Sequence, residues 1–149
     1  MKKAALTALF CASLAFAGGA DLKIFFSHFT ELFSTTNHKA MLDAEMVHFP
    51  LTLKGTLDDS PGAKISSKQF AFVLHKVANQ PSGMNARDFN ETEKDFLSAQ
   101  SAKGKLPEES GNGTVRMGNL VFAQKKGQWK LVRVYVADDL IAEIKKNRR

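Results

Sequence analysis

The chain has 149 residues, of which 21 are Lys or Arg and 15 are Asp or Glu, so its formal net charge is +6. This length fits one domain with a core of its own, and the 44% share of hydrophobic residues excludes intrinsic disorder for most of the chain. Positive charge favours an anionic partner such as nucleic acid or a membrane surface. Whether that interpretation stands depends on where the charges lie.

The N-terminus has the pattern of a secretory signal. Lys2 and Lys3 precede an apolar run from Ala4 to Ala17, which ends in the A-x-A pattern of a signal peptidase site. The run is shorter than the roughly 20 residues of a membrane-spanning helix. We therefore predict a signal peptide over residues 1–17, with cleavage after Ala17 or as late as residue 20.

The rest of the chain, residues 18–149, is predicted to form a single exported domain with a basic C-terminal tail, in the bacterial periplasm or outside the cell. The mature chain has no predicted transmembrane segment. Cys11 is the only cysteine and lies inside the signal, so the mature chain has no disulfide. Leu9 and Phe10 are too large for the site of lipid attachment at a cysteine, which argues against a lipoprotein.

Two helices are predicted first. Asp21 caps one helix, and its apolar stripe has helical spacing: Leu22, Phe25, Phe26, Phe29, Leu32 and Phe33. Residues 34–37 break it and offer a new cap. The second helix extends its apolar face as far as His48 and stops at Phe49-Pro50.

A strand and a third helix follow. Residues 51–57 alternate with Leu on one face, which predicts a strand, and residues 58–62 have the composition of a turn. Ser66 or Ser67 caps the third helix, whose stripe comprises Phe70, Val73, Leu74 and Val77.

The last third of the chain is predicted to hold a hairpin. The pattern is weak over residues 84–113, with a short helix over 91–102 and a polar loop over 103–113. Strands over 114–124 and 128–137 are joined by a turn at Lys125–Gly127. A final helix begins at Asp138 and ends in basic residues, which suit the negative end of its dipole.

This order predicts an α+β fold in which the helices pack on the concave face of a curved antiparallel sheet. Six basic residues lie at the two ends of the chain: Lys2, Lys3, Lys145, Lys146, Arg148 and Arg149. Without them, 15 basic residues stand against 15 acidic ones. The neutral balance of the body argues against nucleic-acid binding. The basic tail could touch anionic lipid or cell wall, or simply end a solvated helix.

Candidate chemistry is sparse. His48 continues an apolar helix face, so it is either a hydrogen-bonded core residue or a pocket acid or base, and it is the weak candidate for a catalytic residue. No histidine pair has zinc-ligand spacing and the mature chain has no cysteine, so no metal is predicted. No phosphate-binding loop or nucleophile motif is present, so no cofactor is predicted.

The two predicted hairpin strands supply further candidates. Strict alternation places Trp129, Leu131, Arg133 and Tyr135 on one face of the last strand. In the preceding strand it places Thr114, Arg116, Gly118, Leu120 and Phe122 together. Arg116 and Arg133 either line a polar spot that binds an anion or extend from the sheet edge into water. The ligand-pocket candidates are His48, Arg116, Trp129, Arg133 and Tyr135.

Several short motifs occur in a familiar order: two helices, Phe49-Pro50-Leu51 entering a strand, a third helix, and Gly127-Gln128-Trp129-Lys130-Leu131 opening the last long strand. In this order the chain resembles small exported bacterial members of the nuclear transport factor 2-like superfamily, the cystatin-like cone. The resemblance covers roughly residues 21–136. It implies a curved sheet wrapped around helices with an apolar pocket, but not an activity, because the superfamily hosts enzymes, dimerisation modules and uncharacterised domains.

The members that resemble ketosteroid isomerase use a tyrosine and carboxylates inside the cone. In this chain the only tyrosine is Tyr135, on the last predicted strand, and the first predicted helix carries Phe where a catalytic Tyr would lie. The catalytic set therefore does not match, and the phenylalanines predict a filled cone.

Three functions are compatible with these observations. The first is an exported, non-enzymatic module that binds a small apolar or anionic ligand, or a protein. The second is a lyase or isomerase with His48 as base and Arg133 or Tyr135 orienting the substrate. The third is an inhibitor or immunity-like partner protein, which requires a large exposed apolar patch. A homodimer through the sheet is also predicted, because apolar residues lie on both faces of the hairpin.

Overall fold

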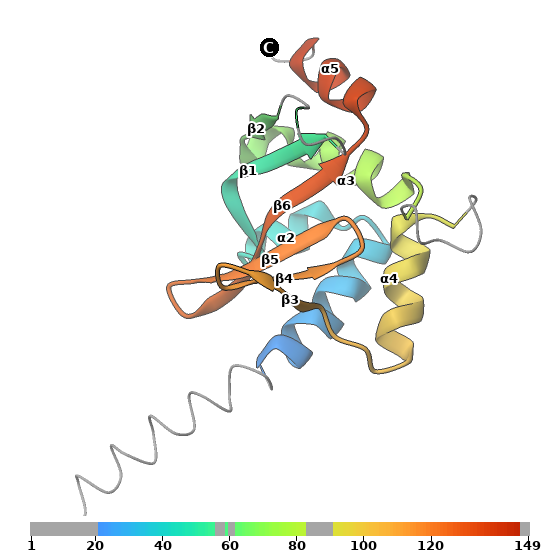
Figure 1. Ribbon diagram of the computed structural model, residues 1–149, viewed down its shortest axis with the longest axis vertical. Helices are drawn as coiled ribbons and strands as arrows, with labels where there is room; N and C mark the ends of the chain where they lie inside the picture. Colours follow the sequence, from blue (N-terminus) through green and yellow to red (C-terminus); the bar gives the residue numbers. More distant parts are fainter. Residues whose placement is uncertain (1–20, 56–58, 60–61, 83–90, 147–149) are drawn as a thin grey trace, which may run out of the picture.

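The computed structural model describes residues 21–55, 59, 62–82 and 91–146 (Figure 1). The predicted signal peptide, most of the turn over residues 58–62, and Arg148 and Arg149 lie outside these residues. In the described part, six strands form one sheet in the order β2-β1-β6-β5-β4-β3, with helices around it. The predicted α+β class, with helices packed on a curved sheet, is confirmed.

The first described element is a helix that occupies residues 21–34, here called the Phe-rich helix. The predicted stripe is its buried side: Phe26, Phe29 and Phe33 are at most 1% exposed, and Phe25 and Leu32 are half-buried. The helix ends in the predicted break. Asn37 then caps α2 (His38–Asp43) by accepting a 3.1 Å hydrogen bond from the Ala40 amide.

The second helix is shorter than predicted. It ends at Asp43, and β1 (Val47–Gly55) includes both His48 and the cis Phe49–Pro50 bond. The prediction that His48 lies on a helix is therefore wrong. Its apolar neighbours reflect the pattern of a strand, in which Val47, Leu51 and Leu53 are buried.

β1 pairs antiparallel with a short strand that the sequence did not predict, β2 (Ala63–Ile65). Ser66, predicted as a cap of the third helix, caps instead the 3₁₀ turn η1 (Ser67–Gln69) that leads into it, where Ser66 and Gln69 form a capping box. The helix α3 (Phe70–Asn79) follows and buries the predicted stripe.

The predicted short helix is confirmed as α4 (Glu93–Ala102), but the predicted loop after it contains a strand, β3 (Glu108–Gly111). The strand predicted over residues 114–124 is in fact a hairpin of β4 (Thr114–Met117) and β5 (Leu120–Lys125). Its two-residue turn is made by Gly118, whose φ is +58°, and Asn119.

β5 leads through a tight turn into β6 (Gln128–Val136). The turn was predicted over Lys125–Gly127, but Lys125 belongs to β5, so the turn consists of Lys126 and Gly127, both with positive φ. β6 pairs antiparallel with β5 and parallel with β1, so the sheet is mixed where an antiparallel sheet was predicted. The final helix α5 (Asp138–Lys146) is confirmed and packs at the β1 end of the sheet (Figure 1).

The strand pairings define two faces of the sheet. One continuous row across the strands is buried throughout and faces the helices: Met117, Leu120, Val134, Leu53 and Ala63. The next row faces the other way and runs across all six strands: Glu108, Arg116, Val121, Arg133, Thr52 and Lys64. We call the side that carries the second row the outer face.

A bulge in β6 changes which residues share a face. Phe122 pairs with Leu131 while Val121 pairs with Arg133, so Val132 is an extra residue in β6. Trp129 and Leu131 consequently face the helices, whereas Arg133 and Tyr135 face outward. The prediction that these four side chains share one face is wrong because strict alternation does not survive a bulge.

The interior between helices and sheet is filled by aromatic rings. Phe122 of β5 makes edge-on contacts with Phe25, Phe26 and Phe29 of the Phe-rich helix, at centroid distances of 5.6, 6.3 and 5.0 Å. Phe29 also stacks on Phe33 at 5.5 Å. Among the described residues, no helix is both long and apolar enough to cross a membrane.

Candidate functional site

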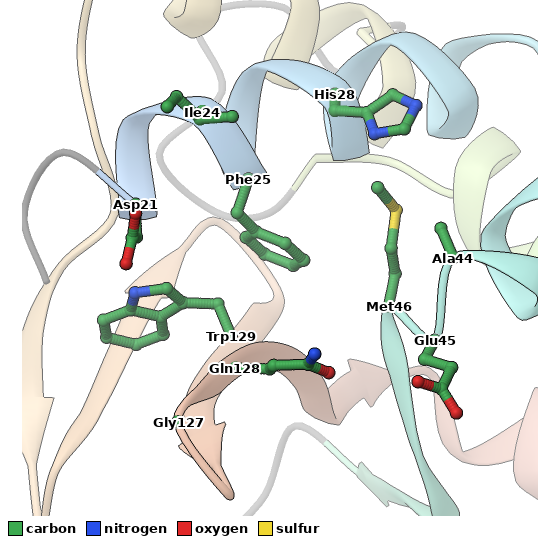
Figure 2. A pocket seen from close by; sticks show the side chains of 10 residues that line it. All are labelled: Asp21, Ile24, Phe25, His28, Ala44, Glu45, Met46, Gly127, Gln128 and Trp129. Atoms are coloured by element: carbon green, nitrogen blue, oxygen red, sulfur yellow. The ribbon is translucent and has the colours of Figure 1, made fainter. Parts of the chain in front are cut away.

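A depression with a largely apolar lining lies where the Phe-rich helix meets the β5–β6 turn (Figure 2). We call it the Trp129 groove, and its volume is about 290 Å³. Its lining residues come from the helix (Asp21, Ile24, Phe25, His28), from the loop before β1 (Ala44, Glu45, Met46) and from the hairpin (Gly127, Gln128, Trp129).

Three elements hold the groove in place. Trp129 faces the helices because of its position in β6, and it packs against the core while remaining half-buried. Met46 is held beside the sheet because its carbonyl accepts a 2.8 Å hydrogen bond from the Leu131 amide. Figure 2 shows Phe25 and Met46 pointing into the space between helix and strands, with Trp129 below them.

The groove has an apolar floor and an acidic rim. Ile24 is 71% exposed, the highest value for a large hydrophobic residue in the described chain. The carboxylates of Asp21 and Glu45 both border the groove, and both residues are exposed. This arrangement favours an apolar ligand that is neutral or positively charged and disfavours an anion.

The structure does not bring the five predicted pocket residues together. Trp129 is the only one that lines this groove. His48 is half-buried in β1 and lines neither groove described here. Arg116, Arg133 and Tyr135 all lie on the outer face, where the Arg116 guanidinium stacks on the Tyr135 ring at 4.3 Å from its centroid.

A second depression, of about 380 Å³, lies between the end of α4 and the β3–β4 hairpin. Its lining is mostly polar: Gln100, Lys105, Leu106, Glu108, Arg116, Met117 and Gly118. Arg116 is fixed at its border because its Nε donates a 2.8 Å hydrogen bond to the Gly118 carbonyl. Both charge signs are present, so this depression selects no one class of ligand.

Glu93, which the sequence pattern did not reveal, is a fully buried carboxylate at the start of α4. Its Oε1 accepts a 2.9 Å hydrogen bond from the Asn119 amide, and its Oε2 accepts one of 3.1 Å from Asn119 Nδ2. Burial raises the pKa of Glu93 to about 7, although both bonds and the charge of Arg116 act to lower it. A glutamate in the first turn after a threonine cap is usually exposed, so its sequence position gave no signal.

Glu93 lines neither groove, so its geometry indicates a structural contact between α4 and the β4–β5 turn. Within the described ranges, no group of three or more His, Cys, Asp or Glu residues is arranged to hold a metal ion.

Comparison with known proteins gave no relative. Scans against protein-family models, curated proteins and solved structures found no match for this chain. The similarity to the nuclear transport factor 2-like superfamily therefore stays a prediction based on the order of short motifs.

Proposed function

We propose that this protein is an exported binding module of the nuclear transport factor 2-like type, and that it takes a small apolar ligand with a positive charge in the Trp129 groove. The observation that carries the proposal is the combination of an open apolar floor with two carboxylates on its rim. Its volume of about 290 Å³ is at the lower end for small-molecule sites, which favours a compact ligand such as an aromatic amine.

Each part of the groove has a role in this proposal. Ile24 and Phe25 offer apolar surface, which favours transfer of a ring out of water. The Trp129 ring can attract a cation over its face. Asp21 and Glu45 add favourable electrostatic energy for an ammonium group, which is moderate because both carboxylates are exposed to water.

The other two functions have less support in the described residues. A histidine-based lyase or isomerase requires His48 in an open pocket, but the interior is filled by phenylalanines and His48 lines neither groove. An inhibitor-like protein requires a large apolar patch. The described exposed large hydrophobics, Ile24 and Phe72, lie on different helices.

The experiment uses Trp129 fluorescence, because Trp129 is the only tryptophan. Titration with phenethylamine should give a saturable change, with a dissociation constant on the order of 1 mM for so small a ligand. Ethylbenzene should bind more weakly and phenylpropanoate weakest, because the acidic rim disfavours a carboxylate.

The double variant Asp21→Asn, Glu45→Gln should remove the preference for the amine over the neutral ring. Glu109→Gln, an exposed carboxylate on β3, serves as the matched control and should leave the order unchanged. Absence of saturation with all three compounds, or tightest binding by phenylpropanoate, would refute the proposal.

A further inference from the structure

The outer face of the sheet carries an excess of positive charge that no single segment of the sequence displays. The strand pairings place six basic residues on this face: Lys54, Lys64, Arg116, Lys125, Lys130 and Arg133. Glu108, at the β3 end of the outer row, is the one acidic residue at the paired outward positions described. A formally neutral body thus has one strongly basic side.

Three of these cations are not neutralised by a neighbouring carboxylate. Among the described residues, the structure records no ion pair for Lys54, Lys130 or Arg133. Arg133 is exposed, and Lys54 and Lys130 are half-buried. Their charges therefore remain available to a partner, at the cost of mutual repulsion while the face is free.

The arrangement of the face is regular. Neighbouring strands lie about 4.8 Å apart, so Arg116 and Arg133, two strands apart, are separated by about 10 Å along the row. The whole row of six strands spans about 24 Å, which matches roughly seven or eight residues of extended chain. Thr52 and Tyr135 add hydroxyl groups between the cations.

We propose that the outer face is a docking surface for an acidic protein segment whose carboxylates pair with Arg133, Lys54 and Lys130. Guanidinium and ammonium groups bind carboxylates through charge-assisted hydrogen bonds, and such complementarity raises the rate and specificity of association. This inference is independent of the ligand in the Trp129 groove, which lies on the helix side of the sheet.

Three other occupants fit the face less well. A second copy stacked face to face would bring like charges together. A membrane would find no exposed large hydrophobic side chain at the described outer positions, since Ile24 and Phe72 lie on helices. A continuous polyanion such as DNA would meet repulsion from Glu108, whereas a protein segment can place a basic group opposite it.

The test measures binding of a fluorescein-labelled glutamate peptide of about eight residues by anisotropy, with a serine peptide of equal length as the uncharged probe. The intact mature protein should bind the glutamate peptide, with affinity falling as salt rises to about 0.15 M. The triple variant Arg133→Gln, Lys54→Gln, Lys130→Gln should weaken binding about tenfold.

A second triple variant controls for net charge. Lys39→Gln, Lys68→Gln, Lys103→Gln removes three exposed lysines, from α2, η1 and the C-cap of α4, and should change the affinity less than about twofold. Circular dichroism confirms that both variants are folded.

Labelled DNA and vesicles containing phosphatidylglycerol are tested in parallel at matched anionic charge. The proposal is overturned if the glutamate peptide does not bind or if the two triple variants lose equal affinity. It is also overturned if DNA or vesicles bind more tightly than the peptide.

Discussion

Glu93 shows how one residue can connect separate elements. It starts α4, yet both oxygens of its carboxylate bind Asn119 in the turn between β4 and β5. Asn119 in turn accepts a 2.8 Å hydrogen bond at its carbonyl from the Tyr135 amide of β6. A buried carboxylate therefore links a helix to two strands, and its protonation state bears on stability.

The folded protein should lose stability as pH rises through the titration range of Glu93. Its pKa is raised from 4.5 to about 7 by burial, so the folded state holds a proton that the unfolded state has released. This contribution to the free energy of unfolding is about 3 kcal/mol. It is complete below about pH 4.5 and is lost as the pH rises to about 7. Urea unfolding at pH 5, near the lower end of this range, and at pH 8, above it, measures most of the difference.

Glu93→Gln isolates this contribution from that of the other titrating groups. The variant keeps a hydrogen-bonding side chain without a charge, so its free energy of unfolding should fall less between the two pH values than that of the wild type. Glu91, whose charge also raises the pKa of Glu93, is unchanged in this variant. The exposed Glu109→Gln control should keep the wild-type slope, and a Glu93→Gln slope equal to it would contradict the assignment.

At the scale of elements, the β4–β5 turn depends on a residue without a side chain. Gly118 has a φ of +58°, and a Cβ at this position would lie 2.6 Å from Glu93 Oε1 and 3.1 Å from Phe96 Cε1. Gly118→Ala should therefore destabilise the protein by about 2 kcal/mol or more, because it combines backbone strain with a clash at a buried carboxylate.

Gly104→Ala separates the two effects. Gly104 has a similar φ of +72°, but no heavy atom lies within 4 Å of the position that a Cβ would take, so this variant should cost only about 1 kcal/mol. Thermal and urea unfolding of both variants give the comparison. Equal losses would show that the contact with Glu93 adds nothing to the cost of the backbone strain.

The elements that sequence predicted well are those with a strong local pattern. The Phe-rich helix, α3 and α5 each show helical spacing of apolar residues. Their positions and their buried residues therefore agree with those predicted. β2 and β3 were missed because each is only three or four residues long and depends on pairing with a distant or neighbouring strand. The bulge at Val132 arises from the pairing of β6 with β5, which local alternation does not reveal. It places Arg133 and Tyr135 on the opposite face from Trp129 and Leu131.

At the scale of the whole molecule, the sequence could suggest individual site residues but not which of them lie together in the folded protein. Trp129 alone of the five candidates lines the groove, and its neighbours there come from the helix and the loop before β1. The separation of an acidic groove rim from a basic outer face depends on which strands are neighbours in the sheet. Net charge summed along the chain hides this separation, because no strand contributes more than two of the cations.

This charge distribution bears on the predicted homodimer. The dimer was predicted because both faces of the hairpin were expected to carry apolar residues, but the outer face presents Arg116 and Arg133. A two-fold axis through that face would place like charges opposite one another, and the electrostatic cost of this repulsion grows as the salt concentration falls. We therefore expect sedimentation velocity to find a monomer at low ionic strength. A dimer that persists at low salt and is disrupted by Arg133→Glu, but not by Lys39→Glu on α2, would show instead that the outer face pairs with itself despite its charge.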